Sequence, residues 1–105
     1  MSIIINSLED YNNINKPDIT IIIKVGADWC APCKSISPFY KLLASNNNNP
    51  NIIYAEINTS NADDDLLDYI NIKSLPTFIF YKNNVILNKI IGCDNILLSK
   101  YIDTL

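Results

Sequence analysis

Two cysteines separated by two residues are the part of this chain best suited to chemistry. They are Cys30 and Cys33, in the segment Trp-Cys-Ala-Pro-Cys-Lys at 29–34. This spacing brings two thiols close enough to form a disulfide. A thiolate is also the form of cysteine that attacks disulfides and binds metals. The candidates are therefore thiol–disulfide exchange, a metal site, or an inert pair of core cysteines.

A metal site fits the composition poorly. A structural zinc ion needs two more soft ligands beside such a pair, and the chain has no histidine and only one further cysteine, Cys93. The acidic run Asp63–Asp65 lacks the pattern of a calcium-binding loop and is better explained as a solvated helix start. We expect no metal, and a dithiol that is itself the reacting group needs no bound cofactor.

The flanking residues place the pair where a strand gives way to a helix. Ile19–Val25 is a nearly unbroken β-branched run, as expected of a central strand buried on both faces. A helix N-terminus offers partial positive charge and free N–H groups, which favour thiolate at Cys30. Pro32 suits a first helical turn. Cys33 lies deeper along the same turn, placed to attack a mixed disulfide formed at Cys30.

The other elements alternate along the chain. That helix has Ile36, Phe39, Tyr40, Leu43 and Ala44 on its apolar face and is bent by Pro38. Further strands are predicted at Ser2–Ile5, Ile52–Ile57, Thr77–Tyr81 and Val85–Ile91, the last two joined by a turn at Asn83-Asn84. A further helix is predicted at Ser7–Ile14. Another is predicted after a cap at Ser60 or Asn61, with Leu66, Leu67 and Ile70 inward. The last is predicted after a cap at Asp94 or Asn95, with Leu97, Leu98, Tyr101 and Ile102 inward.

The resulting order, β-α-β-α-β-α-β-β-α, predicts one α/β domain over residues 1–105 with parallel crossovers and an antiparallel edge. The net charge of −3 gives no basic face for nucleic acid. The apolar stretch Ile19–Val25 is too short to span a membrane. Three cysteines fit a secreted disulfide framework poorly, so we expect a cytoplasmic protein.

Several of these motifs, in this order, resemble the thioredoxin family over nearly the whole chain. The segment at 29–34 is similar to the family's Trp-Cys-Gly-Pro-Cys-Lys site, and Pro38 falls at the family's helix-kinking proline. Ser74–Phe78 resembles the loop that precedes its cis-proline. Ile91-Gly92 matches the glycine after its last strand.

The resemblance implies a thioredoxin fold, with a mixed central sheet flanked by helices on both faces and the cysteines at the end of its central strand. It implies that Pro76 is cis. Without the Cys30 and Cys33 motif, the expectation would be an ordinary trans proline at a strand edge. The Leu75 backbone would pair with an extended substrate segment. An apolar contact patch would surround Cys30, formed by Trp29, Ala31, Pro32, Leu75, Pro76, Gly92 and Cys93.

The activity implied is that of a monomeric protein-disulfide reductase. Cys30 and Cys33 would exchange with disulfides of protein substrates, and a reductase or dithiol would restore the pair. Two alternatives remain open. One is a more oxidising protein of the oxidase or isomerase kind, and the other is a thioredoxin-fold module that mainly binds a partner.

Lys24 is the largest departure from the family, which commonly carries a buried aspartate there to assist proton transfer at the second cysteine. The matching position on the neighbouring strand is Glu56. Either Lys24 snorkels to solvent or simply pairs with Glu56, or the pair serves Cys33 in proton transfer with reversed polarity. A cation there would also stabilise the Cys30 thiolate and make the disulfide more oxidising.

Two smaller departures concern Gly26 and Cys93. Gly26 stands where the family usually has an aromatic residue, so we expect looser and wetter packing beneath the cysteines. Cys93 is either a small, partly buried residue without a redox role or a regulatory thiol beside the contact patch.

Overall fold

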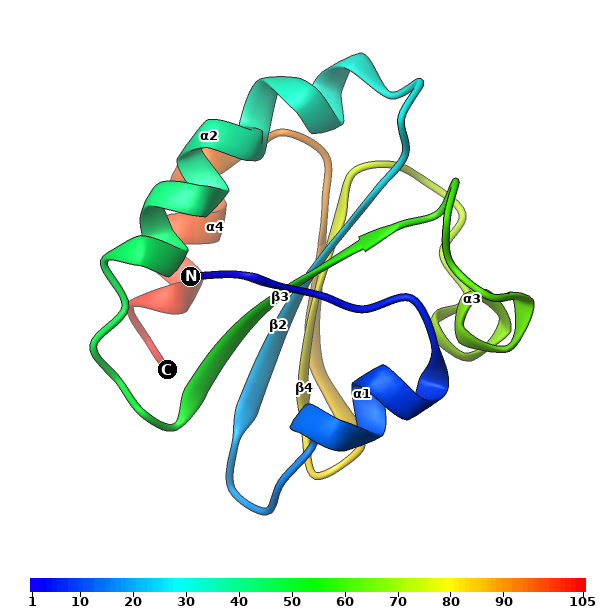
Figure 1. The fold of residues 1–105 in the computed structure, drawn as a ribbon. Coiled ribbons are helices and arrows are strands. Elements are labelled where there is room, and N and C mark those ends of the chain that lie inside the picture. The colour runs from blue at the N-terminus through cyan, green and yellow to red at the C-terminus, as the bar shows by residue number, and fades with distance from the viewer.

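Five strands and four helices follow one another in the predicted order in the computed structural model, which describes residues 1–105 (Figure 1). The elements are β1 (Ile3–Ile4), α1 (Leu8–Ile14), β2 (Thr20–Gly26), α2 (Ala31–Ser45), β3 (Ile52–Asn58), α3 (Asp64–Ile70), β4 (Thr77–Lys82), β5 (Val85–Ile91) and α4 (Asn95–Ile102). None of the helices combines the length and the apolar content that crossing a membrane requires.

The strands form one mixed sheet in the order β1-β3-β2-β4-β5. The pairs β1–β3 and β3–β2 are parallel, whereas β4 runs antiparallel to both β2 and β5. Strand β2 therefore lies at the centre, and all seven of its residues are buried. This confirms the central position predicted for the β-branched run, because only a strand covered on both faces needs apolar residues without alternation.

Helices cover both faces of the sheet, as predicted. Ile21 and Ile23 of β2 pack with Tyr11 of α1 and Leu66 of α3 in one hydrophobic cluster. On the other face, Ile22 packs in a second cluster with residues of α2 and α4. Figure 1 shows these two helices on one side of the strands and α1 and α3 on the other. The strand that leads to the cysteines, β2, is thus packed on both faces.

The predicted hairpin turn is confirmed. Asn83 and Asn84 both have positive φ, 52° and 64°, which is the backbone of a tight type I′ turn. The Asn84 side-chain oxygen accepts hydrogen bonds from the Tyr11 hydroxyl at 3.3 Å and the Asn15 amide at 2.7 Å. The turn is therefore tied to α1 as well as to its own strands.

Two details of the helices correct the sequence prediction. Helix α3 has Asp63 at its N-cap, not Ser60 or Asn61, because the Asp63 N–H donates to the carbonyl of Asn6 at 2.8 Å and Ser60 is used elsewhere. Leu97, predicted to point inward, is 49% exposed. Only one side of α4 meets the sheet, and Leu98 occupies it.

The buried tyrosines predict a loss of stability at alkaline pH. Burial raises the pKa of Tyr81 to about 12, and burial raises the pKa of Tyr40 well above 10. Above pH 10 these side chains ionise in the unfolded chain but stay protonated in the folded one, so the free energy of unfolding falls as pH rises from about 10 to 12. The urea midpoint should be lower at pH 11 than at pH 8.

Tyr81→Phe isolates this effect, since it keeps the ring and removes the ionisable group. The fall in midpoint between pH 8 and pH 11 should be smaller in this variant than in the parent protein. Equal pH dependence in Tyr81→Phe and in the parent would contradict the assignment.

Candidate active site

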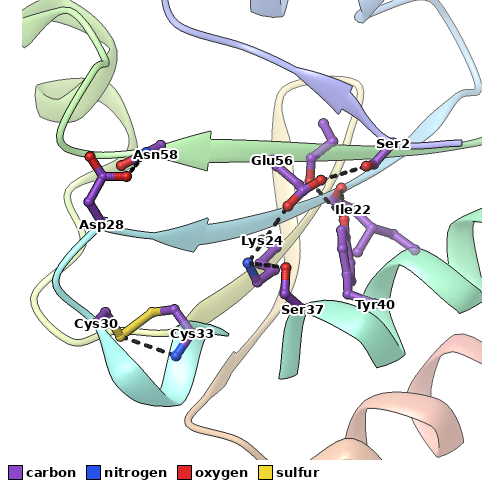
Figure 2. Close-up of polar contacts among 11 residues, drawn as sticks. Ser2, Ile22, Lys24, Asp28, Cys30, Cys33, Ser37, Tyr40, Glu56 and Asn58 are labelled. Atoms are coloured by element: carbon purple, nitrogen blue, oxygen red, sulfur yellow. Dashed lines mark hydrogen bonds and ion pairs between the residues drawn. A yellow bond between two sulfur atoms is a disulfide. The ribbon is translucent and has the colours of Figure 1, made fainter. Parts of the chain in front are cut away.

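The two cysteines lie where the chain leaves β2 and enters α2. Cys30 is the N-cap of α2, and Pro32 occupies its first turn. A disulfide joins Cys30 to Cys33, whose Cα atoms are 5.3 Å apart (Figure 2). The Cys33 N–H points at the sulfur of Cys30, 3.2 Å away. The first sulfur thus takes the place of a capping oxygen, where the helix dipole and a free N–H favour negative charge.

Both cysteines are nearly covered. Cys30 is 4% exposed and Cys33 is 3% exposed, and Ala27 and Leu75 pack against them. Trp29, by contrast, is 76% exposed. A large apolar ring beside a recessed sulfur is suited to a protein partner that presses onto this surface, because contact with the ring removes apolar area from water.

The loop before β4 closes over the pair. The peptide bond between Leu75 and Pro76 is cis, as the resemblance implied, and the expectation of an ordinary trans proline is wrong. The Thr77 hydroxyl donates to the carbonyl of Ser74 at 2.7 Å. The Gly92 N–H donates to the carbonyl of Pro76 at 2.8 Å. Gly92 has φ of 94°, a value that favours glycine.

Cys93 lies beside this loop and close to the disulfide. Its thiol is exposed, and its S–H donates to the carbonyl of Pro32 at 2.9 Å. Of the two alternatives for Cys93, the partly buried residue is therefore wrong as to burial, and its redox role stays a prediction. Of the predicted patch residues, Leu75 packs against the two cysteines, Trp29, Ala31 and Pro32 are exposed, and Gly92 is half-buried. Pro76 is buried just before β4, so it adds no exposed surface to the patch.

Lys24 and Glu56 face each other beneath the pair. They are register partners on β2 and β3, and Lys24 Nζ lies 3.7 Å from Glu56 Oε1 (Figure 2). Lys24 is only 7% exposed, so it does not reach solvent as a snorkelling lysine would. Its second partner is the Ser37 hydroxyl at 3.4 Å. The Ser2 hydroxyl donates to Glu56 Oε2 at 2.5 Å.

Ser2 and Ser37 are site residues that the sequence did not reveal. Ser37 follows Cys33 by four positions, so the two share a helix face, and that spacing was an available signal. Ser2 could not be found in this way, because its position depends on how β1 pairs with β3. In the structure, Ile3 and Ile4 pair with Ala55 and Glu56.

Gly26 packs closely against the redox pair. A Cβ at Gly26 would stand 3.2 Å from both the Cβ and the sulfur of Cys33, which is tighter than ordinary van der Waals contact, and 3.9 Å from Lys24 Nζ. The looser packing expected at Gly26 is therefore not found at the residue itself. The open space lies beside it, because Gly26, Cys33 and Lys24 line an open cavity of about 530 Å³ that reaches Lys34, Lys41 and Glu56.

Tyr40 holds the helix that carries the pair against the sheet. Its hydroxyl lies 2.8 Å from the carbonyls of both Ile22 and Ala55, which belong to β2 and β3. The side chain is fully buried. Burial first, and then the negative charge of Glu56, raise the pKa of Tyr40 well above 10. The sequence indicated only its apolar role; its hydroxyl fixes α2 relative to the strands that carry Lys24 and Glu56.

No cluster of three or more His, Cys, Asp or Glu side chains is placed to hold a metal ion. The geometry is instead that of a disulfide at a helix N-terminus, with the Cys30 sulfur where a thiolate would be stabilised once the bond opens, and with the Cys33 sulfur near a buried ion pair. Such an arrangement can accept two electrons and two protons by opening the Cys30–Cys33 bond.

Comparison with known proteins identifies the family. The family model described as Thioredoxin matches residues 2–104. A thioredoxin of Coprinus comatus is 29% identical over 87% of this chain and 85% of its own. Thioredoxin-1 of Caenorhabditis elegans is 39% identical over 73% of this chain and 64% of its own, so the match spans under two thirds of that relative. A solved Entamoeba histolytica thioredoxin variant covers 100% of both chains at 27% identity, with a TM-score of 0.86. The chain belongs to the thioredoxin family of thiol–disulfide oxidoreductases.

Proposed function

We propose that the chain is a protein-disulfide reductase in which Cys30 is the attacking residue and Cys33 the resolving one. The Cys30 thiolate attacks one sulfur of a substrate disulfide, and the other substrate sulfur leaves as a thiolate. Cys33 then attacks the Cys30 sulfur of the mixed disulfide and releases the second substrate thiolate. The substrate gains two electrons, and the Cys30–Cys33 bond forms. The observation that carries this proposal is the Cys33 N–H directed at the Cys30 sulfur.

Protein substrates would dock on the contact patch around Cys30. The apolar part of the patch, led by exposed Trp29, would cover the recessed sulfur. The Leu75 backbone forms none of the protein's own backbone hydrogen bonds. Its N–H and carbonyl are therefore available to an extended substrate segment, which would add to the protein as a short strand.

Lys24 and Glu56 would manage the proton at Cys33. The cavity beside Gly26 is lined by Lys24, Cys33 and Glu56, and its volume of about 530 Å³ has room for water. When the disulfide opens, the Lys24 ammonium can give a proton through that water to the Cys33 thiolate and take one back from solvent, while Glu56 holds the lysine in place. This is the family's proton-assisting role with its charge reversed.

The same cation bears on the direction of electron flow. A positive charge beneath the pair stabilises thiolate, hence the reduced form, and so makes the disulfide more oxidising. We propose that the chain is a reductant, and that its reduction potential is higher than that of a variant with an acidic residue at position 24. The chain would act as a monomer in the cytoplasm, where a reductase or dithiol regenerates the dithiol.

Trapping the mixed disulfide tests this assignment. In the Cys33→Ser variant the resolving thiol is absent, so incubation with insulin should leave a covalent complex bonded through Cys30. Peptide mass spectrometry should locate the bond, and dithiothreitol should release it. The experiment is made in a Cys93→Ser background, which removes the exposed third thiol. Absence of a complex, or a complex that forms equally well in Cys30→Ser, would overturn the assigned roles.

A further inference from the structure

A cavity on the side of the redox pair away from Trp29 is not used by the proposed docking of proteins. It measures about 530 Å³ and is lined by Lys24, Gly26, Cys33, Lys34, Lys41 and Glu56, among others. We call it the Gly26 hollow. Trp29, Leu75 and Cys93 do not line it. Its volume lies in the range of cavities that hold small molecules.

Cys33 is one of the residues that line the hollow, although only 3% of it is exposed. Its sulfur lies 3.2 Å from the point where a Cβ on Gly26 would stand, so any larger residue at this position would cover it. Figure 2 shows Cys33 as the member of the disulfide on the side of Lys24 and Ser37. The second cysteine, recessed from the contact patch, therefore borders the hollow, and a small reagent in the hollow would meet it with Gly26 beside it.

The charges lining the hollow favour an anion. Three lysines face two carboxylates, Asp28 and Glu56. Both carboxylates are engaged: Glu56 by Lys24 and Ser2, and Asp28 by the Asn58 amide at 2.7 Å. Lys34 and Lys41 form no ion pair, since Lys24–Glu56 is the one ion pair of the structure. Their positive charge at the rim would raise the local concentration of small anions.

We propose that the Gly26 hollow is a second entrance to the redox pair, through which small anionic thiols reduce the disulfide by attack on Cys33. The proposal rests on the proposed function, since it supplies the reductant for the same disulfide. It names a class of co-reactant, low-molecular-weight thiols that carry a carboxylate or a similar anionic group.

The chemistry of the disulfide favours attack at this sulfur. A thiolate that bonds to the Cys33 sulfur expels Cys30, and the thiol that is better stabilised as thiolate is the better leaving group. Cys30 is that group, because the helix N-terminus and the Cys33 N–H face it. A second small thiolate then attacks the sulfur of the first, forms a small disulfide and releases Cys33 as thiolate. Two electrons enter the protein, and two small thiols are oxidised.

Charged thiol reagents test the entrance directly. In the reduced Cys30→Ser, Cys93→Ser protein, Cys33 is the only thiol. We expect a methanethiosulfonate that carries a sulfonate to label Cys33 about tenfold faster than one that carries a trimethylammonium group. Adding Gly26→Val should slow labelling by both reagents at least about tenfold, because the side chain closes the hollow. Circular dichroism and a urea midpoint check that this variant is folded.

Lysine variants keep the test decisive even if Gly26→Val does not fold. Lys41→Gln, at the rim of the hollow, should reduce the preference for the anionic reagent. Lys16→Gln removes the same charge at the opposite end of β2 and should not. Equal labelling rates with both reagents, or a preference for the anionic reagent that Lys41→Gln does not change, would overturn the proposal of a second entrance. The proposed function fails separately, if the protein with intact cysteines does not reduce insulin.

Discussion

Replacement of Cys30 by serine is expected to lower the rate of insulin reduction at least about a hundredfold, to the rate of dithiothreitol alone. A serine hydroxyl at this N-cap receives the same help from the Cys33 N–H, but it stays protonated near neutral pH. It also cannot form a covalent bond to a substrate sulfur. The turbidity of precipitating insulin, followed with dithiothreitol as the electron source, measures the rate.

The third cysteine provides the matched control. Cys93→Ser makes the same atomic change on an exposed thiol that forms no disulfide, and it should retain most of the activity. A partner-binding module would behave differently: Cys30→Ser would then keep full biological function in cells although its reductase activity is gone. That outcome would show that the role in cells does not depend on the reductase activity, whereas unchanged insulin reduction in Cys30→Ser would refute the assigned chemistry.

The central strand and the helix that follows it were predictable because their signals are local. A β-branched run such as Ile21–Ile23 is uncommon outside a strand buried on both faces, and a proline in a first helical turn loses no hydrogen bond. The turn at Asn83-Asn84 is equally local, since asparagine tolerates positive φ. These features fix the position of Cys30 and Cys33 without any knowledge of distant contacts.

The errors arose where a residue's environment depends on distant parts of the chain. The start of α3 is set by a hydrogen bond to Asn6, so its local acidic pattern placed the cap at the wrong residue. The exposure of Leu97 depends on how little of α4 the sheet covers. Ser2 reaches Glu56 only because β1 pairs with β3 in one particular register.

The resemblance to a family could place the patch and the cis-proline, but not the state of Lys24. Residue type alone left open whether Lys24 reaches solvent, simply pairs with Glu56, or serves Cys33 together with Glu56, and its burial excludes only the first. Lys24 is covered, and Glu56 and Ser37 are its only side-chain partners. Lys24, Glu56 and Cys33 also line one cavity, which no single position in the sequence indicates.

Reversing the charge at Lys24 should lower the reduction potential of the Cys30–Cys33 pair. Lys24 Nζ and the Cys33 sulfur both lie within 4 Å of one point, so they are at most about 8 Å apart. Unit charges at about 8 Å interact by about 2 kcal/mol at an effective dielectric constant of about 20. In Lys24→Asp the stabilising interaction with a thiolate becomes repulsive, so the reduced form loses stability. We expect the potential to fall by about 30 mV or more, which corresponds to about a tenfold change in the equilibrium constant.

Equilibration with reduced and oxidised glutathione, followed by alkylation and mass spectrometry, measures the potential. Lys24→Met removes the charge without reversing it and should give an intermediate value. Lys16→Asp carries the full reversal at the opposite end of β2, beyond the reach of the cysteines, and should keep the parent potential. Because Lys24→Asp sets a carboxylate against Glu56, its urea midpoint should also fall. The reduction potential is a separate measurement, since it compares the oxidised and reduced forms of the folded protein. A potential in Lys24→Asp equal to or above that of the parent would show that the buried ammonium does not act on the sulfurs.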